Sequence, residues 1–219
     1  AAGDLNRDGL IDLVAASHFN RLHVYLNERN QQLSETVIPR PDGFSGAKLR
    51  DLDGDGKLDL LLLGYYKAGL EVLTYDDSGK WSYKDTLHSG IGRDVVLADL
   101  DHDEKDEIIA AFARDGAVVL TRDARGAWQG GSTNFYSLNK DFHSVAVADV
   151  NHDGHADIAL NGGFTELTGP NGPDVYLGDG AGNWQASSDG LKALKIPTQG
   201  VALADADGDG HPDLLAGGN

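Results

Sequence analysis

Residues 51–60 read DLDGDGKLDL, and this acidic stretch decides the fold because it recurs along the chain. The other copies are DLNRDGLIDL at 4–13, DLDHDEKDEI at 99–108, DVNHDGHADI at 149–158 and DADGDGHPDL at 205–214. The first Asp of each copy follows the previous first Asp by 47, 48, 50 and 56 residues. Five copies at nearly constant spacing indicate a repeat protein with units of about fifty residues.

Short apolar runs on both sides of each acidic stretch predict strands. VAVAD at 145–149 precedes one copy and DLLLLG at 59–64 lies at the end of another. Two more apolar segments follow, separated by turns rich in Gly and Asn, so each unit is expected to be four antiparallel strands. Repeated four-stranded units are typical of the blades of a β-propeller, and an all-β fold is therefore predicted. The expected repeats are approximately 1–43, 44–91, 92–141, 142–197 and 198–219.

The two ends of the chain carry incomplete units. The first repeat begins only three residues before its acidic stretch, and the fifth ends after its second strand. We therefore expect three complete blades, a nearly complete first blade and half of a fifth. This count predicts an arc of a larger propeller, completed by other blades of the parent protein or by another chain, because an incomplete ring would expose a sheet edge.

The composition excludes several classes of function. The 219 residues include 35 acidic and 18 basic side chains, which gives a formal net charge of −17. Such a surface repels phosphate backbones and anionic lipids, so neither nucleic-acid binding nor membrane insertion is expected. Cysteine is absent, which excludes a disulfide framework and a thiol nucleophile. Neither a membrane-spanning run nor a signal peptide is recognised.

The first nine residues of each copy form an acidic loop that alternates oxygen-bearing side chains. We name them loop one (4–12), loop two (51–59), loop three (99–107), loop four (149–157) and loop five (205–213). Alternate residues of a tight turn point into one concavity, and hard oxygen donors in a flexible loop favour Ca²⁺. Positions one, three, five and nine are the predicted side-chain ligands: Asp4, Asn6, Asp8 and Asp12; Asp51, Asp53, Asp55 and Asp59; Asp99, Asp101, Asp103 and Glu107; Asp149, Asn151, Asp153 and Asp157; Asp205, Asp207, Asp209 and Asp213. Position seven is predicted to add its backbone carbonyl, from Leu10, Lys57, Lys105, His155 and His211.

Two other interpretations of the loops fit the sequence less well. An EF-hand needs a Glu at position twelve between helices, whereas position twelve here is apolar and the flanks are β. A second alternative is that the loops are only hairpin turns and bind no cation. In that case the like-charged side chains of each loop would repel one another. Five equivalent sites favour a structural role for up to five Ca²⁺ ions over a catalytic one. Loop three departs most, because Glu104 replaces the turn glycine and Glu107 replaces Asp.

The loops and their flanking strands resemble FG-GAP/VCBS repeats, the calcium-binding blades of integrin-α-type and many secreted propellers. The resemblance covers essentially the whole chain, and its shared core reads D-x-[DN]-x-D-G-x-x-D-[LI]. The resemblance implies a Ca²⁺-bearing propeller, usually extracellular. It implies no single activity, because adhesion modules, lectins and polysaccharide lyases share the repeat.

The face opposite the acidic loops is the predicted ligand face. Loop lengths vary most there, with an insertion at 162–174. Insertions on one face often mark a binding surface, although a neutral surface loop and solvated rim groups are the alternatives. The candidate residues are Ser45, Tyr65, Tyr66, Arg93, His143, Phe164 and Gln199. Trp81, Trp128 and Trp184 recur at equivalent places in their repeats and are interpreted as packing residues.

Two functions from different classes remain at this point. The first is an extracellular or periplasmic recognition scaffold, as in cell adhesion, for a glycan or a protein ligand. The alternative is part of a secreted polysaccharide lyase or another carbohydrate-active enzyme, in which Arg93 and His143 would serve a uronic acid substrate. No catalytic or cofactor-binding residue is assigned, because the sequence carries no nucleophile elbow, phosphate loop or dinucleotide fingerprint.

Overall fold

The computed structural model is built of β-strands, as the repeats predict. It describes residues 1–29, 32–66, 68–113, 115–130, 141–162, 172–188, 191 and 199–218. Among these residues there is no helix long and apolar enough to cross a membrane. The chain divides into two compact units, Ala1–Gly92 and Arg93–Asn219, which are described separately.

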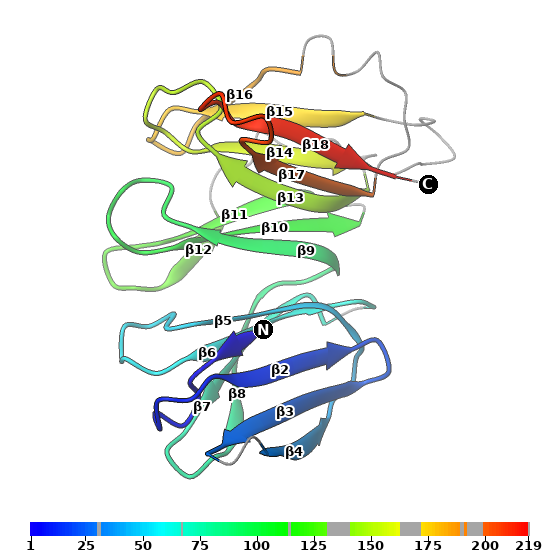
Figure 1. The fold of residues 1–219 in the computed structure, drawn as a ribbon, viewed down its shortest axis with the longest axis vertical. Helices are drawn as coiled ribbons and strands as arrows, with labels where there is room; N and C mark the ends of the chain where they lie inside the picture. The colour runs from blue at the N-terminus through cyan, green and yellow to red at the C-terminus, as the bar shows by residue number, and fades with distance from the viewer. Residues whose placement is uncertain are drawn as a thin grey trace. The chain divides into compact units, whose positions relative to one another are not determined.

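The first unit contains two four-stranded antiparallel sheets, in which neighbouring strands follow the chain order (Figure 1). Hairpins join the strands of each sheet, so each sheet forms one blade. The strands of the first sheet are β1 (Ala2–Gly3), β2 (Asp12–Ser17), β3 (Arg21–Glu28) and β4 (Gln32–Pro39). Those of the second sheet are β5 (Phe44–Arg50), β6 (Asp59–Gly64), β7 (Leu70–Tyr75) and β8 (Trp81–His88).

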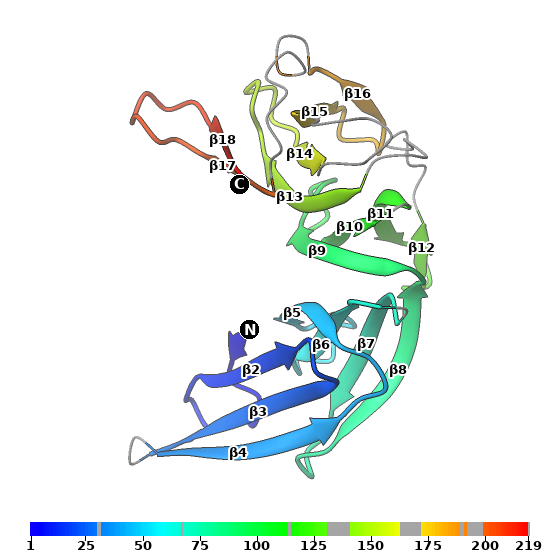
Figure 2. The same ribbon diagram turned by 90° about the vertical axis from the view of Figure 1, so that its right-hand side faces the viewer.

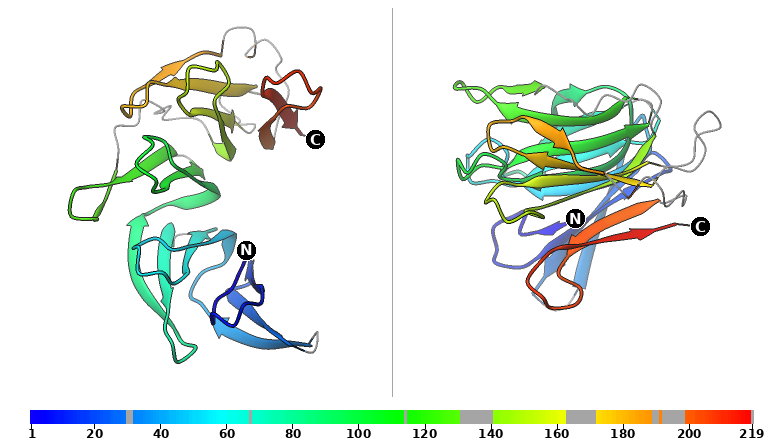
Figure 3. Two further views of the ribbon diagram at one scale, coloured as in Figure 1. Left: turned by 60° about the vertical axis from the view of Figure 1, so that its left-hand side comes forward. Right: turned by 90° about the horizontal axis from the view of Figure 1, so that it is seen from above.

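The second unit contains two more four-stranded sheets and one two-stranded sheet (Figure 2). Its first sheet consists of β9 (Ile91–Ala98), β10 (Glu107–Ala113), β11 (Gly116–Arg122) and β12 (Trp128–Gly130). The next consists of β13 (Phe142–Ala148), β14 (Asp157–Gly162), β15 (Pro173–Gly178) and β16 (Trp184–Ala186). The hairpin of β17 (Gly200–Ala204) and β18 (Asp213–Gly217) stands at the end of the chain (Figure 3). A two-residue first strand and a two-stranded last sheet confirm the predicted incomplete repeats.

The second strand is the most buried element of the blades that contain β6 and β10. Every described residue of β6 and β10 is buried, and these strands read DLLLLG and EIIAAFA. Their continuous apolar runs follow from burial on both faces of the sheet, since neither face is left to water. Each strand begins at the ninth residue of an acidic loop, so the buried core fixes one end of that loop.

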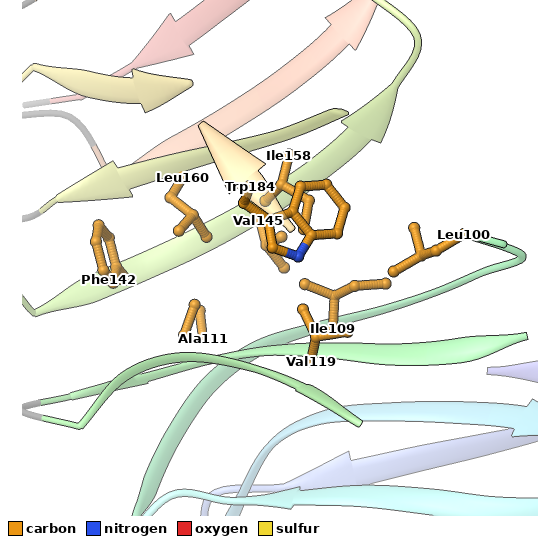
Figure 4. Packing of buried hydrophobic residues seen from close by; sticks show 10 residues of the cluster. Leu100, Ile109, Ala111, Val119, Phe142, Val145, Ile158, Leu160 and Trp184 are labelled. Atoms are coloured by element: carbon orange, nitrogen blue, oxygen red, sulfur yellow. The ribbon is translucent and has the colours of Figure 1, made fainter. Parts of the chain in front are cut away.

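Blades pack against their neighbours through shared apolar clusters. In the first unit, Leu22 and Val24 of one blade pack with Phe44 and Leu60 of the next. In the second unit, residues of β10 and β11 meet β13 and β14, and Trp184 lies in the same cluster (Figure 4). A single blade cannot bury both of its faces, so stacking supplies the core. Trp184 and Trp81 pack in these apolar clusters, as predicted. The ring of Trp128 lies under Arg122, whose guanidinium carbon is 4.0 Å from the ring centroid.

Candidate metal centre

Each acidic loop joins the first and second strands of its sheet. The ninth residue pairs with the last residue of the preceding strand, as in Gly3 with Asp12 and Arg50 with Asp59. The same pairing holds for Ala204 with Asp213 in the final hairpin. The strand register thus holds both ends of the loop, and the residues between them form the turn.

The carboxylate at position nine closes the loop from inside. In all five loops one of its oxygens accepts a hydrogen bond from the backbone N–H of position two. These bonds are Leu5 to Asp12 at 2.8 Å, Leu52 to Asp59 at 3.0 Å, Leu100 to Glu107 at 2.8 Å, Val150 to Asp157 at 2.8 Å and Ala206 to Asp213 at 3.0 Å. The sequence predicted this residue as a cation ligand, and the structure adds that it caps the turn.

The other acidic side chains also accept backbone hydrogen bonds within their loops. In loop one, Asp4 accepts from the N–H groups of Asp8 and Gly9, at 3.1 and 2.9 Å. Asn6 accepts from Asp8 N–H, and Asp8 accepts from Leu10 N–H. The bond from the N–H of position six to the position-one side chain recurs in all the other loops. The bond from position five recurs in loops three, four and five, whereas in loop two Asp51 accepts from Gly54 instead. Position seven donates its N–H to position five throughout, and its carbonyl as a ligand stays a prediction.

Two residues of every loop have a left-handed backbone. Position six is left-handed in all five loops, and Glu104 adopts it at φ 67° where the other four have glycine. Position four is left-handed as well, in Arg7, Gly54, His102, His152 and Gly208. The sequence predicted the reversal at position six only. A non-glycine residue in this region costs roughly 1–2 kcal/mol, so loop three carries strain at both positions.

Three loops bring three carboxylates together. One oxygen from each member of a trio lies within 4.8 Å of the others in Asp51, Asp53 and Asp59, in Asp99, Asp101 and Glu107, and in Asp205, Asp207 and Asp213. These are positions one, three and nine, and position five lies outside each trio. Loops one and four have Asn at position three, so among the described residues they form no such all-acidic trio.

Position nine differs between these two kinds of loop. In loop one both oxygens of Asp12 accept backbone N–H groups, from Leu5 and from Asn27 at 2.8 Å. In loop four Asp157 likewise accepts from Val150 and from Gly178, at 2.8 and 2.9 Å. Asp59, in contrast, accepts one backbone hydrogen bond within the described residues. One oxygen of Asp59 lies within 4.8 Å of a carboxylate oxygen of Asp51 and of Asp53.

In loops two and three the trio includes one buried carboxylate, Asp59 or Glu107, whereas no member of the loop-five trio is buried. Burial raises the pKa of Asp59 to about 6, and the neighbouring Asp53 carboxylate adds to the rise. Burial also raises the pKa of Glu107, with Asp101 and Asp103 acting in the same direction. A divalent cation would remove this repulsion, and the all-oxygen donor set is the set that Ca²⁺ prefers. The residues present therefore fit the ion that the repeats imply.

Lysine side chains offset part of the acidic charge at the loop surface. Lys84 Nζ lies 2.5 Å from Asp53 Oδ2, and Lys105 Nζ lies 2.8 Å from Asp103 Oδ2. The Lys105 contact lowers the pKa of Asp103. Both pairs are solvent-exposed to a large extent, so each adds little stability of its own.

The predicted ligand-face residues are divided between the two units. In the first unit, Ser45 Oγ donates to the carbonyls of Leu63 and Gly92, at 3.2 and 3.0 Å. Tyr65 stacks on His18 with ring centroids 4.5 Å apart and meets Tyr66 edge-on at 5.0 Å. Tyr66 is 56% exposed. Ser45 is thus engaged in sheet packing, whereas Tyr66 presents an aromatic ring to solvent.

In the second unit Arg93 and His143 converge on Asp141. The guanidinium Nε of Arg93 lies 3.4 Å from Asp141 Oδ1, and His143 Nε2 lies 3.5 Å from Asp141 Oδ2. Asp141 is half-buried; burial opposes its ionisation, but its contacts with His143 and Arg93 lower its pKa. Gln199 is exposed and donates its backbone N–H to Gly217. Phe164 lies outside the described residues.

A second recurring turn was not singled out from the sequence. Asp76, Asp123 and Asp179 each begin the hairpin between the third and fourth strands, and each accepts the backbone N–H groups of the second and fourth residues that follow. The pKa of all three carboxyls is lowered, first by side-chain hydrogen bonds from Ser78 to Asp76 and from Asn183 to Asp179, and at Asp123 by the backbone hydrogen bonds. Backbone hydrogen bonds also lower the pKa of Asp76 and Asp179. The signal is an Asp that opens the Gly-containing turns DDSGK, DARGA and DGAGN.

Comparison with known families places the acidic loops in a defined repeat. The FG-GAP-like repeat model matches residues 4–62, 51–110, 99–160 and 165–216. The chain belongs to the FG-GAP-like repeat family. The first three matches overlap at loops two and three, so each of them spans one blade and the acidic loop of the next. The fourth match begins at residue 165, after loop four, and includes loop five. A search of curated proteins found no match.

Solved structures show the same fold at low sequence identity. A crystal structure of a protein from Lactobacillus plantarum has 18% identity and a TM-score of 0.50, and the similarity covers 80% of this chain and 52% of that one. A crystal structure of BBS1N in complex with ARL6DN, soaked with lead, has 14% identity and a TM-score of 0.59, with 93% and 59% covered. This FG-GAP-like chain thus spans little more than half the length of those chains.

Proposed function

We propose that this FG-GAP-like protein is a calcium-stabilised scaffold that works outside the cell and recognises a glycan or a protein ligand. The observation that carries the proposal is the carboxylate trio, which recurs at equivalent positions of three blades. A repeated cation site in a hairpin stabilises each blade, whereas a catalytic centre occurs once. Extracellular calcium is abundant enough to fill sites of the affinity common in extracellular modules.

Thermal unfolding with and without calcium tests the metal. With free Ca²⁺ about 100-fold above its Kd, each occupied site adds about 2.7 kcal/mol to the free energy of unfolding. EDTA should therefore lower the melting temperature sharply, and Mg²⁺ should restore it poorly because Mg²⁺ demands a tighter octahedral site. A melting temperature that is the same in EDTA and in Ca²⁺ would contradict calcium binding.

Exposed aromatic residues in the first unit support ligand recognition on the face away from the acidic loops. Phe19 follows β2 and is 85% exposed, and Tyr66 follows β6. Their loops are fixed by backbone hydrogen bonds, from Arg40 N–H to Asn20 and from Tyr65 N–H to Gly43, at 3.0 and 2.7 Å. Rings held open to water can stack on sugar rings or anchor a protein partner.

Binding to a glycan array by the calcium-loaded protein tests this role. Tyr66→Ala should reduce binding at least fivefold, and Tyr83→Ala, which removes a comparably exposed ring from β8, should leave it unchanged. Equal losses in both variants would rule out Tyr66 as part of a ligand site.

The enzyme alternative keeps one observation in its favour. A lyase needs a cation to neutralise a uronic carboxylate and a base to remove the adjacent proton. Arg93 and His143 approach the same carboxylate, Asp141, and could supply these two groups. Formation of an unsaturated product from uronic polysaccharides, lost in His143→Ala, would support it, and binding without turnover would favour the scaffold.

A further inference from the structure

The side chain at position four reaches from one acidic loop to the next. In the first unit, Arg7 Nη2 of loop one donates to the carbonyl of Gly56 in loop two, at 2.6 Å. In the second unit, His102 Nε2 of loop three lies 2.8 Å from the carbonyl of Gly154 in loop four. Two different side chains from two different units thus meet the same acceptor, the carbonyl of position six. A further position-four residue, His152, packs its ring 4.5 Å from that of His211 in loop five.

The contacted carbonyl belongs to a peptide whose N–H donates a hydrogen bond within the acidic loop. The Gly56 carbonyl and the Lys57 N–H lie in one peptide plane, and Lys57 N–H donates to Asp55 at 2.8 Å. The same arrangement holds in loop four, where His155 N–H donates to Asp153 at 2.8 Å. The side chain from the neighbouring loop therefore contacts the carbonyl oxygen of this peptide, and the position-five carboxylate accepts its N–H.

Each position-four residue is itself set by its own loop. Arg7 lies between Asn6 and Asp8 and has φ 60°, and His102 lies between Asp101 and Asp103 with φ 63°. A cation that orders the flanking side chains would also fix the direction of the position-four side chain. The hydrogen bond from this side chain to the next loop would then also restrict the conformation of that loop.

We infer that Arg7 and His102 are positioning residues for the cation sites of loops two and four, and that they couple calcium binding within the loop pairs one–two and three–four. This inference rests on the proposed calcium function. A coupling of this kind is reciprocal, so a cation in loop two strengthens binding in loop one by the same factor. Loop two carries Gly54 at position four and has no side chain for such a contact.

Glycine-selective ¹⁵N NMR gives a separate readout for four of the loops. Gly9, Gly56, Gly154 and Gly210 occupy position six of loops one, two, four and five. Their amide shifts, followed during titration of the metal-free protein with Ca²⁺, give a midpoint for each loop. The variants Arg7→Gly and His102→Gly remove the contact and keep the left-handed backbone, because glycine adopts it freely.

In Arg7→Gly the Gly56 midpoint should rise about threefold, which is the effect of losing one modest hydrogen bond, while that of Gly210 stays unchanged. Arg7→Lys, which keeps a charged donor, should restore at least half of the change. Removing a cation alone would lower the midpoints of Gly9 and Gly56 together, so the sign separates the contact from the charge. In His102→Gly the Gly154 midpoint should rise about threefold, and His102→Gln should recover part of it.

A Gly56 midpoint that does not rise in Arg7→Gly, or that rises equally in Arg7→Lys, overturns the inference. If the loop glycines respond to Ca²⁺ in the unmodified protein and the variants match it, only the coupling is wrong. If no loop glycine responds in the unmodified protein, the calcium function and the coupling both fail.

Discussion

Loops one and four differ from loops two, three and five at position three, where Asn replaces Asp. All five close their hairpins in the same way, with the position-nine carboxylate accepting the N–H of position two. In loops one and four both oxygens of that carboxylate accept backbone N–H groups, whereas Asp59 of loop two accepts one such bond within the described residues and belongs to a carboxylate trio. The difference shows that the acidic loop has two separable roles. The position-nine carboxylate closes the turn, and the carboxylates at positions one, three and nine together gather negative charge for a cation.

The largest expected effect separates these tasks at position nine. Asp12→Ala leaves two backbone N–H groups without an acceptor and should lower the free energy of unfolding by about 3 kcal/mol in EDTA. Asp59→Ala leaves only one backbone N–H group without an acceptor, and it removes a buried carboxyl whose pKa is raised. The free energy of unfolding of this variant in EDTA should therefore fall by about half as much. Urea unfolding of both variants measures this, with Asp12→Asn as a control that keeps an acceptor. Equal losses would mean that the two kinds of loop close alike.

Exchanging the residue at position three should exchange the calcium affinities. Asn6→Asp gives loop one a carboxylate at each of positions one, three and nine and should tighten its Ca²⁺ binding about tenfold. Asp207→Asn should weaken the binding of Ca²⁺ by loop five by a similar factor. The Gly9 and Gly210 amide midpoints report the two loops individually. Unchanged midpoints in both variants would show that the charge at position three does not set affinity.

A smaller effect is expected at the strained turn of loop three. Glu104→Gly relieves a left-handed residue and should raise the free energy of unfolding by about 1 kcal/mol. The reverse change in a loop with the usual glycine, Gly154→Glu, should lower it by a similar amount. Thermal unfolding at saturating Ca²⁺ measures both, and a loss of stability in Glu104→Gly would argue against backbone strain.

The smallest effect concerns Asp123, whose turn binds no cation in this interpretation. Backbone hydrogen bonds from Ala127 and Arg125 lower the pKa of Asp123, so its contribution to stability is present above about pH 4 and is lost as the pH falls through the lowered value. Asp123→Asn should therefore flatten the decline of stability in acid. Urea midpoints at neutral and acidic pH in EDTA test this; identical pH profiles for the variant and the unmodified protein would contradict it.

The repeat period and the alternation of apolar residues sufficed to predict four-stranded antiparallel blades and the incomplete end units. Spacing alone also predicted which oxygens share a loop. It did not reveal that positions one, three and nine gather while position five turns to the backbone of position seven, because that choice depends on backbone dihedrals. The left-handed backbone at position four was not predicted either, because glycine stands there in only two of the five loops, as Gly54 and Gly208.

Contacts between residues far apart in the chain were also not predicted from the sequence. His102 reaches a carbonyl 52 residues away, which no local pattern indicates. Likewise, Arg93 and His143 were candidates for the ligand face, but their convergence on Asp141 depends on the register of neighbouring blades. Short motifs carry local geometry well, whereas contacts between blades depend on how the sheets stack.

The buried carboxylate at position nine also bears on how such repeats decay over evolutionary time. A copy that loses its acids at positions three and five gives up its cation but can still close its hairpin, whereas loss of the ninth acid removes an acceptor from a buried backbone donor. Purifying selection should therefore release position nine last. In strongly diverged blades, a lone Asp at the start of the second strand is the trace by which a former calcium loop can be recognised.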